Sequence, residues 1–274
     1  MSESSMNLLA VSVGNSTTRL GRFRGRELLR SQRLMNAQQA VLLQQARSMV
    51  EELTAEADGG PAAVVVASVN EPAARGLVDA LGETPGAPIY RIGLDLAIPI
   101  ETALAEGATP GQDRLLNALA AYENMKQACV VVDCGTAVTV DFVDGMGVFQ
   151  GGAIAPGAGM QLAALHERTA ALPSIVLGRP DAGPFGKNTA EAMLNGVYFG
   201  IRGLVRILVE RYAEAYEGYP PVVATGGDAA LIFDDDELID RIVPDLTLWG
   251  IEAACRRALT DDEDRVEPGR GEDA

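Results

Sequence analysis

The stretch AVSVGNSTTRLG (Ala10–Gly21) begins with apolar residues typical of a buried strand and then breaks into small polar ones. The polar part, Gly14–Thr18, separates two segments with strand character, so a hairpin is the simplest interpretation. A second interpretation is that the backbone N–H groups and hydroxyls of this turn face a bound anion. The rest of the sequence has to distinguish between the two.

A similar pattern occurs in the second half of the chain, in VVVDCGTAVTV (Val130–Val140). Asp133 lies near the end of an apolar strand, and Gly135 and Thr136 follow it in the expected turn. An Asx-type turn in a hairpin explains this segment when it is taken alone. A carboxylate beside Gly-Thr can also hold a cation, while the glycine lets a phosphate approach backbone N–H groups. Two such turns facing one cleft would clamp a polyphosphate.

Each of the two turns begins a block of strands that is followed by helices, which indicates a weak internal duplication. We expect an α/β protein with two similar domains in tandem, residues 1–112 and 113–259, and a cleft between them. Residues 260–274 contain almost no apolar side chains and many acidic ones, so we expect a disordered acidic tail.

The alternation and spacing of apolar residues predict the individual elements. Strands are expected over 8–13, 18–24, 63–69, 129–134, 135–144, 147–155 and 220–227, with a short strand-like segment in 87–100. Helices are expected over 37–57, 71–82, 113–128, 160–172 and 188–217, with short helical segments after residue 227.

The composition limits the possible classes of function. The chain has 274 residues and a formal net charge of −16, so we expect a globular protein that binds no nucleic acid. No apolar run reaches the ~18 residues that a bilayer requires, and we expect no membrane association. The N-terminal MSESSMNLL lacks the basic and apolar segments of an export signal, which predicts a cytoplasmic location. Three cysteines without a CxxC or Cys/His pairing favour neither a disulfide framework nor a zinc site.

TPGQDRLLNALAAY (Thr109–Tyr122) places an Asp-Arg pair directly after Gly111, at the expected start of a helix. An acidic residue is common at this position because it interacts favourably with the helix dipole. The functional interpretation is that Asp113 is a general base and that Arg114 binds a substrate carboxylate.

ATGGDAAL (Ala224–Leu231) places Gly226 and Gly227 between a strand and a helix. A tight βα turn explains the two glycines, and close approach of the backbone to the adenosine of a nucleotide is the alternative. The only histidine, His166, is expected to be structural or solvated. One histidine and no nucleophile elbow are too little for Ser-His-Asp chemistry. The sequence also has no P-loop, and no GxGxxG motif follows an expected strand.

Seven segments occur in the order typical of type III pantothenate kinases, and the sequence resembles this family from about Leu8 to Ala258. They are VGNSTTRLG, GQDRLLNALAAY, VVVDCGTAVTVDFV, GGAIAPG, TAALP, GKNTAEAMLNGVYFG and ATGGDA. Any one of these segments is weak evidence, but seven in order are specific.

The resemblance implies a fold of two ribonuclease-H-like domains, as in sugar kinases, actin and heat-shock chaperone ATPases, with ATP in the cleft between them. It implies phosphoryl transfer from ATP to pantothenate, giving 4′-phosphopantothenate in the first committed step of coenzyme A synthesis. It also implies Mg²⁺, a monovalent cation (K⁺ or NH₄⁺), and a homodimer whose interface helps to form the pantothenate pocket.

The resemblance also assigns site residues. Asp113 would accept the proton of the substrate hydroxyl, and Asp133 would bind the monovalent cation. The expected ATP contacts are Ser12, Gly14, Asn15, Ser16, Thr17, Thr18, Arg19, Thr136, Gly226 and Gly227. The expected pantothenate contacts are Gly111, Gln112, Asp113, Arg114 and Thr189.

The sequence departs from the family pattern in two places. The family motif of the first turn is D-x-G-N-T, and here Ser12 stands at the aspartate position and Ser16 at the threonine position. The segment ETALAEGATPG (101–111) lacks the tyrosine that many members have in the pantothenate pocket. An active pantothenate kinase is the first hypothesis, and a catalytically weak or inactive paralogue that acts as a nucleotide-binding regulator is the second. A kinase of the same fold for another hydroxyl substrate is the third.

Overall fold

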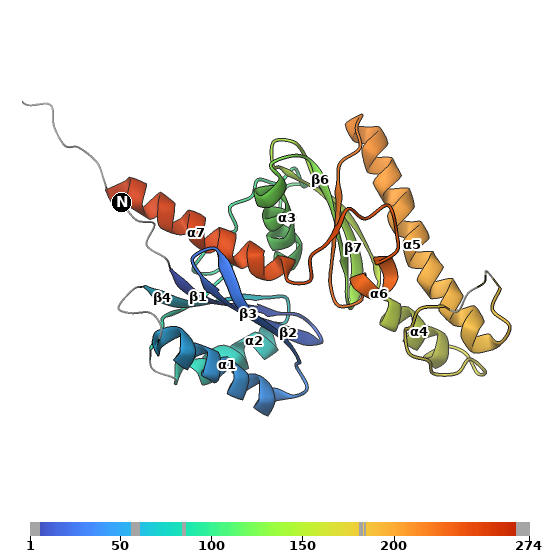
Figure 1. Cartoon of the computed structure of the whole chain (residues 1–274), viewed down its shortest axis with the longest axis horizontal. Coiled ribbons are helices and arrows are strands. Elements are labelled where there is room, and N and C mark those ends of the chain that lie inside the picture. The colour runs from blue at the N-terminus through green and yellow to red at the C-terminus, as the bar shows by residue number, and fades with distance from the viewer. Residues whose placement is uncertain (1–5, 56–60, 84–85, 181–182, 184, 267–274) are drawn as a thin grey trace, which may run out of the picture. The chain divides into compact units, whose positions relative to one another are not determined.

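The computed structural model describes residues 6–55, 61–83, 86–180, 183 and 185–266, without the side chains of 261–266 (Figure 1). The strands are β1 (Asn7–Val13), β2 (Thr17–Arg24), β3 (Glu27–Met35), β4 (Ala62–Ser68), β5 (Ile89–Arg91), β6 (Cys129–Cys134), β7 (Ala137–Val143), β8 (Phe149–Pro156), β9 (Val222–Thr225) and β10 (Arg241–Ile242). The helices are α1 (Gln39–Ala55), α2 (Glu71–Gly82), α3 (Gln112–Met125), α4 (Ala158–Glu167), α5 (Thr189–Tyr216), α6 (Ala229–Phe233) and α7 (Leu246–Val266).

The chain forms two compact units, and each is discontinuous in sequence. The first comprises Met1–Pro99, Pro110–Ala120 and Thr247–Ala274, and the second comprises Ile100–Thr109 and Ala121–Leu246. This division differs from the expected boundary between residues 112 and 113. It falls inside α3, and it returns nearly all of α7 to the first unit.

The first unit contains a five-stranded sheet with the order β3-β2-β1-β4-β5. β1, β2 and β3 form an antiparallel meander, and the β1–β2 hairpin closes at the pair Val13 and Thr18. β4 runs parallel to β1, with Ser68 opposite Val13. Because the carboxyl ends of these two parallel strands meet at one edge, the segments that follow them lie side by side.

The second unit repeats this topology. Its five-stranded sheet has the order β10-β9-β6-β7-β8, so β6, β7 and β8 correspond to β1, β2 and β3, while β9 and β10 correspond to β4 and β5. β6–β7–β8 is again an antiparallel meander, and β9 is parallel to β6. The expected fold class, α/β with two ribonuclease-H-like domains in tandem, is confirmed by this repeated arrangement.

Helices cover the sheets with their apolar faces. In the first unit, α1 and α2 lie on one side of the sheet, and side chains of Leu9, Val11, Leu20, Met49 and Leu77 form part of the core there (Figure 1). In the second unit, the core between the sheet and α4, α5 and α6 includes Val132, Val140, Leu162, Ile201 and Phe233. Burial of these apolar surfaces is the main stabilising contribution in each unit.

α7 packs on the other side of the first sheet. Gly21 and Phe23 alternate with the core-facing Leu20 along β2 and therefore point to this side. The Phe23 and Trp249 rings meet edge to face with centroids 5.1 Å apart. A Cβ at Gly21 would lie 2.7 Å from Leu248 Cδ1, so glycine leaves the room that α7 occupies.

Three local expectations differ from the structure. The expected disordered tail, residues 260–274, overlaps the end of α7, which extends to Val266, while 267–274 lie outside the described residues. The strand-like segment 87–100 contains only the three-residue strand β5. β3 was not predicted, because most of its residues are exposed or half-buried and its apolar pattern is weak.

α5 is long and apolar enough, by length and composition, to cross a membrane. Core helices of soluble proteins pass the same test, and one such helix is weak evidence. Its inner face carries Met193, Val197, Ile201, Val205 and Val209, which are buried against the second sheet. Core packing thus explains the apolar residues on the inner face of α5.

Candidate functional site

The first predicted turn is held by a side chain from the end of β3. Asn36 Nδ2 donates to the carbonyl oxygens of Gly14 (2.7 Å) and Asn15 (3.1 Å). Its Oδ1 accepts a hydrogen bond from Thr18 Oγ1 (2.8 Å), and the Gly14 N–H donates to the Thr17 carbonyl (2.9 Å). Because two carbonyls of the turn are bound inward by Asn36, the turn has a fixed shape before any ligand arrives.

The segment after β4 joins this turn. Val69 N–H donates to the Val13 carbonyl (3.0 Å), and Asn70 Nδ2 donates to the Asn15 carbonyl (3.3 Å). Asn70 is also the N-cap of α2 and donates its own N–H to Ser68 Oγ (2.9 Å). The ends of β1 and β4 are therefore connected by side chains as well as by the strand ladder.

The predicted Asp-Arg pair lies at the start of α3, next to the end of β4. Asp113 Oδ1 accepts a hydrogen bond from the Arg114 N–H (2.8 Å). A Cβ added at Gly111 would lie 2.6 Å from Asp113 Oδ1, so the carboxylate occupies the space beside this glycine. The same Cβ would lie 3.9 Å from Val69 Cγ1, which places the segment after β4 next to the glycine. Burial raises the pKa of Asp113, and the hydrogen bond and charge of Arg114 oppose this only in part.

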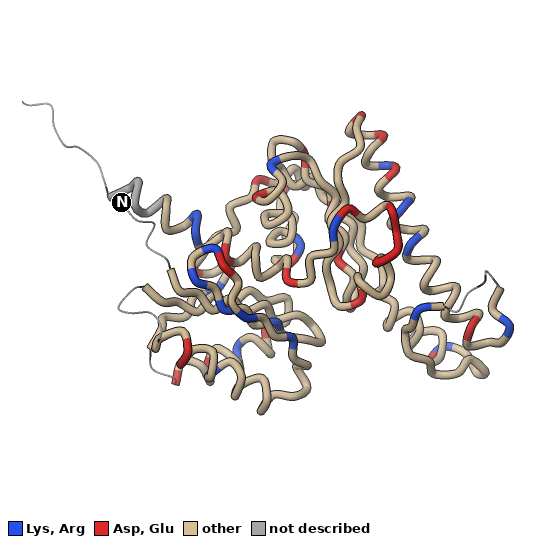
Figure 2. Tube along the Cα trace, in the orientation of Figure 1, with Lys and Arg blue, Asp and Glu red and all other residues tan. Residues whose placement is uncertain are grey.

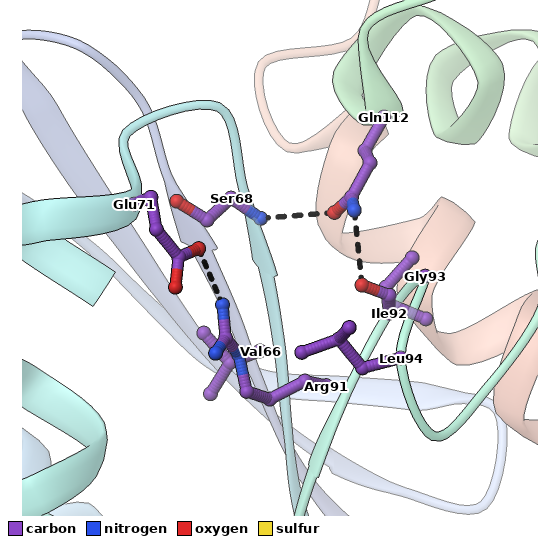
Figure 3. Close-up of a pocket in the computed structure, with 8 residues that line it drawn as sticks. All are labelled: Val66, Ser68, Glu71, Arg91, Ile92, Gly93, Leu94 and Gln112. Carbon is purple, nitrogen blue, oxygen red and sulfur yellow. Dashed lines mark hydrogen bonds and ion pairs between the residues drawn. The ribbon is translucent and has the colours of Figure 1, made fainter. Parts of the chain in front are cut away.

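Gln112, the first residue of α3, bridges two strands with its carboxamide. Its Oε1 accepts from the Ser68 N–H (3.2 Å), and its Nε2 donates to the Ile92 carbonyl (2.9 Å), as Figure 3 shows. A cavity of about 200 Å³ lies beside it, and an ion pair of Arg91 with Glu71 (2.6 Å) spans that cavity. The hydrogen bond from Arg91 lowers the pKa of Glu71.

The first unit therefore brings together two groups of predicted residues that are far apart in sequence. The turn after β1 and the start of α3 are linked by hydrogen bonds through Asn15, Asn70, Ser68 and Gln112. Residues of both groups, Gly14, Asn15, Thr17, Thr18, Gly111, Gln112, Asp113 and Arg114, belong to this one unit.

In the second predicted turn, the backbone after β9 lies close against the end of β6. Gly226 follows β9 with a φ of +98°, and a Cβ there would lie 2.5 Å from Asp133 Oδ1 and 2.2 Å from the Cys134 carbonyl oxygen. The Asp228 N–H donates to that same carbonyl (3.0 Å). Only glycine fits at 226, because the backbone is left-handed and the space is filled. Asp133 and Gly226 are thus direct neighbours in the second unit.

Thr136 faces the beginning of α4. Its carbonyl oxygen accepts a hydrogen bond from the N–H of Gly157, the N-cap residue of that helix (3.0 Å). A Cβ at Gly157 would lie 2.1 Å from the Gly135 carbonyl oxygen. The GGAIAPG segment thus closes against the second turn through the glycine that ends it.

Thr189 lies apart from the residues described above, because no described contact connects it to another predicted site residue. It is exposed in the first turn of α5, where the N-cap Asn188 accepts a hydrogen bond from the Glu191 N–H and donates its Nδ2 to Glu191 Oε1. In the part of the chain that the structure describes, Thr189 has no hydrogen bond to another predicted site residue.

Other chemistry has little support. Burial raises the pKa of the Cys129 thiol to about 12, and that of Cys255 likewise, so neither is an activated nucleophile. His166 is exposed, and its Nδ1 lies 2.8 Å from the Leu172 carbonyl oxygen. Among the described residues, no group of three or more His, Cys, Asp and Glu side chains could hold a metal ion.

Arginines concentrate on β2 and β3, although the chain as a whole is acidic (Figure 2). Arg22 and Arg30 point toward α1 and pair with Glu52 there. Arg19 lies opposite Ser12 on β1 and opposite Arg33 on β3. Arg19 and Arg33 thus form a cross-strand pair one residue beyond the first turn.

Three residues that sequence analysis did not single out hold the site together: Asn36, Ser68 and Asn70. Each is a small polar residue directly after, or at the end of, a predicted or observed strand. That position is a usable sequence signal for Ser68 and Asn70, which end the apolar run of β4. For Asn36 the same signal can be used only when the position of β3 is known.

The sequence matches the family described as Type III pantothenate kinase over residues 8–211. The Type III pantothenate kinase of Dehalococcoides mccartyi is 35% identical over 257 residues, covering 90% of this chain and 96% of that protein. The Type III pantothenate kinase of Syntrophotalea carbinolica is 31% identical over 250 residues, covering 89% of this chain and 96% of that protein.

Solved structures support the fold. A Campylobacter jejuni protein, whose description names the Baf family of transcriptional activators, superposes with a TM-score of 0.55 at 19% identity, covering 92% of this chain and 99% of that one. The ethanolamine utilization protein EutJ of Carboxydothermus hydrogenoformans gives a TM-score of 0.51 at 15% identity, covering 90% and 89%. At these identities the likeness concerns the fold alone.

Proposed function

We propose which residues of this protein carry out the reaction of its family. The chain belongs to the type III pantothenate kinase family and is an ATP-dependent pantothenate kinase. The residues at the ends of β1, β4, β6 and β9 are proposed to act on its two substrates, ATP and pantothenate. One observation carries the proposal: within a single unit, side-chain hydrogen bonds join the first turn to Gln112, the residue directly before Asp113. A phosphate-binding turn and a base at a fixed separation are what phosphoryl transfer to a hydroxyl requires.

Asp113 is the proposed general base. As the hydroxyl oxygen of pantothenate bonds to the γ-phosphorus of ATP, the Asp113 carboxylate accepts the hydroxyl proton, and the bond from that phosphorus to the bridging oxygen breaks to release ADP. Burial, which raises the pKa of Asp113, supports this role because a carboxylate with a raised pKa is a stronger base. The guanidinium of Arg114, the next residue, is the proposed partner of the pantothenate carboxylate.

The two turns are the proposed nucleotide contacts. The first turn, with Ser12 and Arg19 in neighbouring strand positions, would bind the phosphates, and Thr136 would contact them from the second turn. Gly226 and Gly227 would lie against the adenosine. The backbone of Gly111 and Gln112, and the Thr189 hydroxyl, are proposed to contact pantothenate.

The residues present fit the cations of the family. Mg²⁺ bound to ATP phosphates would neutralise their charge and needs few protein ligands. For K⁺ or NH₄⁺, the proposed ligand is Asp133. Its carboxylate lies beside Gly226, which has no side chain to cover it, and the Cys134 carbonyl oxygen lies at the same glycine. A carboxylate with carbonyl oxygens is a suitable donor set for K⁺.

A homodimer is proposed on the outer face of α5. Phe199 (49% exposed) and Ile207 (56% exposed) lie on this face. The same face carries Gly196, Gly200 and Gly203, where an added Cβ would meet no other atom within 4 Å. An apolar, smooth helix face of this kind suits a two-fold contact with a second copy. Thr189 begins the same helix, so a dimer built on it would place this hydroxyl near the interface. A cytoplasmic location is proposed because the reaction consumes ATP.

A coupled ADP-release assay tests the function. We expect ADP release that requires both ATP and pantothenate and that rises when K⁺ is added. Nucleotide binding by calorimetry without any turnover would instead favour the regulator hypothesis. Turnover with another hydroxyl compound, but not with pantothenate, would favour a kinase of different specificity.

A further inference from the structure

The carboxamide of Gln112 occupies the place of a hydrogen bond in the sheet. β4 and β5 are parallel, and the Ile92 N–H donates to the Val66 carbonyl (2.9 Å). In a parallel ladder, the next hydrogen bond would run from the Ser68 N–H to the Ile92 carbonyl. Here Ser68 N–H instead donates to Gln112 Oε1, and Gln112 Nε2 donates to the Ile92 carbonyl (Figure 3). The side chain is inserted where the two strands separate.

The surroundings are shaped for this insertion. Gly93 has a φ of +82°, and a Cβ there would lie 2.5 Å from Gln112 Nε2. Both the backbone conformation and the space therefore require glycine at 93. Each end of the carboxamide is bound to a backbone group, so the side chain is oriented by the strand ends.

The cavity beside Gln112 does not by itself indicate a ligand. Its two charged groups, Arg91 and Glu71, pair with each other at 2.6 Å, and a ligand for either would have to break that pair. The polar groups of Ser68 and Gln112 are likewise bonded within the protein. The cavity is best explained as the space left where β4 and β5 diverge.

We infer that Gln112 is a positioning residue, which fixes the Asp113 carboxylate relative to the phosphate-binding turn. Gln112 and Asp113 are consecutive in the first turn of α3, so holding one side chain to the sheet restrains the other. From Ser68 the hydrogen bonds continue through Asn70 to the carbonyl of Asn15 in the first turn. The base and the turn are thereby tied to the same strand end. This inference rests on the proposed role of Asp113.

The test compares two substitutions. Gln112→Met has a similar length but removes both hydrogen bonds, and Gln112→Glu keeps the acceptor for Ser68 and removes the donor to Ile92. Since a misplacement of about 1 Å can cost ~10²-fold in rate, we expect Gln112→Met to lower kcat by about 10- to 100-fold. The KM for ATP should change less than about threefold, because Asn36 holds the first turn independently of α3. Gln112→Glu should give an intermediate kcat. Gln127→Met, at an exposed glutamine after α3, is the matched control and should keep wild-type kcat.

The pH profile separates positioning from loss of folded protein. When α3 is loosened, water should reach Asp113 and its pKa should fall toward the ordinary value, so the acid limb of kcat/KM should move to lower pH. A purely structural role would reduce the folded fraction without moving this limb. An unmoved limb, with kcat per folded molecule within twofold of wild type, would overturn the inference.

A double-mutant cycle separates this inference from the proposed function. If Gln112 acts through Asp113, Gln112→Met should lower the residual kcat of Asp113→Asn by less than twofold. A multiplicative loss would show that Gln112 acts elsewhere and would also overturn the inference. Failure of the proposed function would look different, because the wild-type protein itself would then release no ADP with pantothenate.

Discussion

Ser12 and Asp133 occupy the same position in the two repeated sheets. Ser12 is paired with Arg19 on β2 and with Ala67 on β4, while Asp133 is paired with Thr139 on β7 and with Thr225 on β9. Each is the penultimate residue of the strand that leads into one of the two turns proposed to bind phosphate. The duplicated scaffold thus carries an acid in one half, and in the other half a hydroxyl opposite an arginine.

The Ser12→Asp substitution would restore an acid at the first turn. Ser12 is half-buried, and the guanidinium of Arg19 in the opposite strand position offers the new carboxylate a partner, so we expect the variant to fold. A carboxylate near Mg·ATP should lower the Mg²⁺ concentration for half-maximal rate. A Mg²⁺ titration at fixed ATP measures this, and Ser12→Asn is the uncharged control. An active Ser12→Asp protein with an unchanged midpoint would remove Ser12 from the metal's surroundings.

Asp133→Ala should abolish or blunt stimulation by K⁺ at saturating Mg²⁺, because the monovalent cation would lose its anionic ligand. The activity should be measured as a function of K⁺ concentration, with Asp79→Ala, at an exposed acid on α2, as the control. A K⁺ response like that of the wild-type protein would place the cation site elsewhere.

Asp113→Asn should lower kcat by ~10²–10⁴-fold, as expected for loss of a general base. In the wild-type protein kcat/KM should rise with pH through the raised pKa of Asp113, and the variant should lack this limb.

The stability of the wild-type protein should respond to pH in the opposite sense. Below the ordinary pKa of an aspartic acid, 3.8, Asp113 is protonated in both the folded and the unfolded state, so no charge is buried on folding. Above the folded-state pKa, the buried charge destabilises the wild-type protein. The free energy of unfolding of Asp113→Asn should therefore rise relative to that of the wild-type protein as the pH increases. Near-normal kcat in a folded variant would contradict the base assignment.

Gly226→Ala should lower the free energy of unfolding by about 1–3 kcal/mol, since alanine is strained at a φ of +98° and its Cβ would meet the Cys134 carbonyl. Gly76→Ala, in the middle of α2 with open space around it, is the matched control. It should raise the free energy of unfolding by about 0.5–1 kcal/mol. Urea unfolding of both variants measures the difference, and equal effects would show that the second turn is not tightly packed.

Gly200→Arg should convert a dimer to a monomer in sedimentation velocity without lowering Tm, because the residue is exposed on α5 with nothing within 4 Å. Gly76→Arg makes the same change on an exposed helix position of the first unit and should leave the dimer intact. A Gly200→Arg protein that remains dimeric would exclude this face as the interface.

Much of the fold was predictable because its signals are local. The runs before Gly14 and Gly135 are apolar enough to identify β1 and β6, and the small polar turns identify the hairpins. β3 and Asn36 could not be predicted in this way. The strand is mostly exposed, and Asn36 reaches the first turn only because the meander returns beside it. The role of Gln112 was also out of reach, since it depends on where β4 and β5 diverge.

The return of α7 to the first sheet has a consequence for how the chain folds during synthesis. The second unit is nearly contiguous, so it is complete once residue 246 has left the ribosome. The first unit is begun first, but the face of its sheet that carries Gly21 and Phe23 stays uncovered until Leu248 and Trp249 have been synthesised. Domains usually fold in the order in which they are made. Here the second unit should reach its native state first, and the N-terminal sheet should remain dependent on chaperones, or sensitive to proteases, until α7 has been translated.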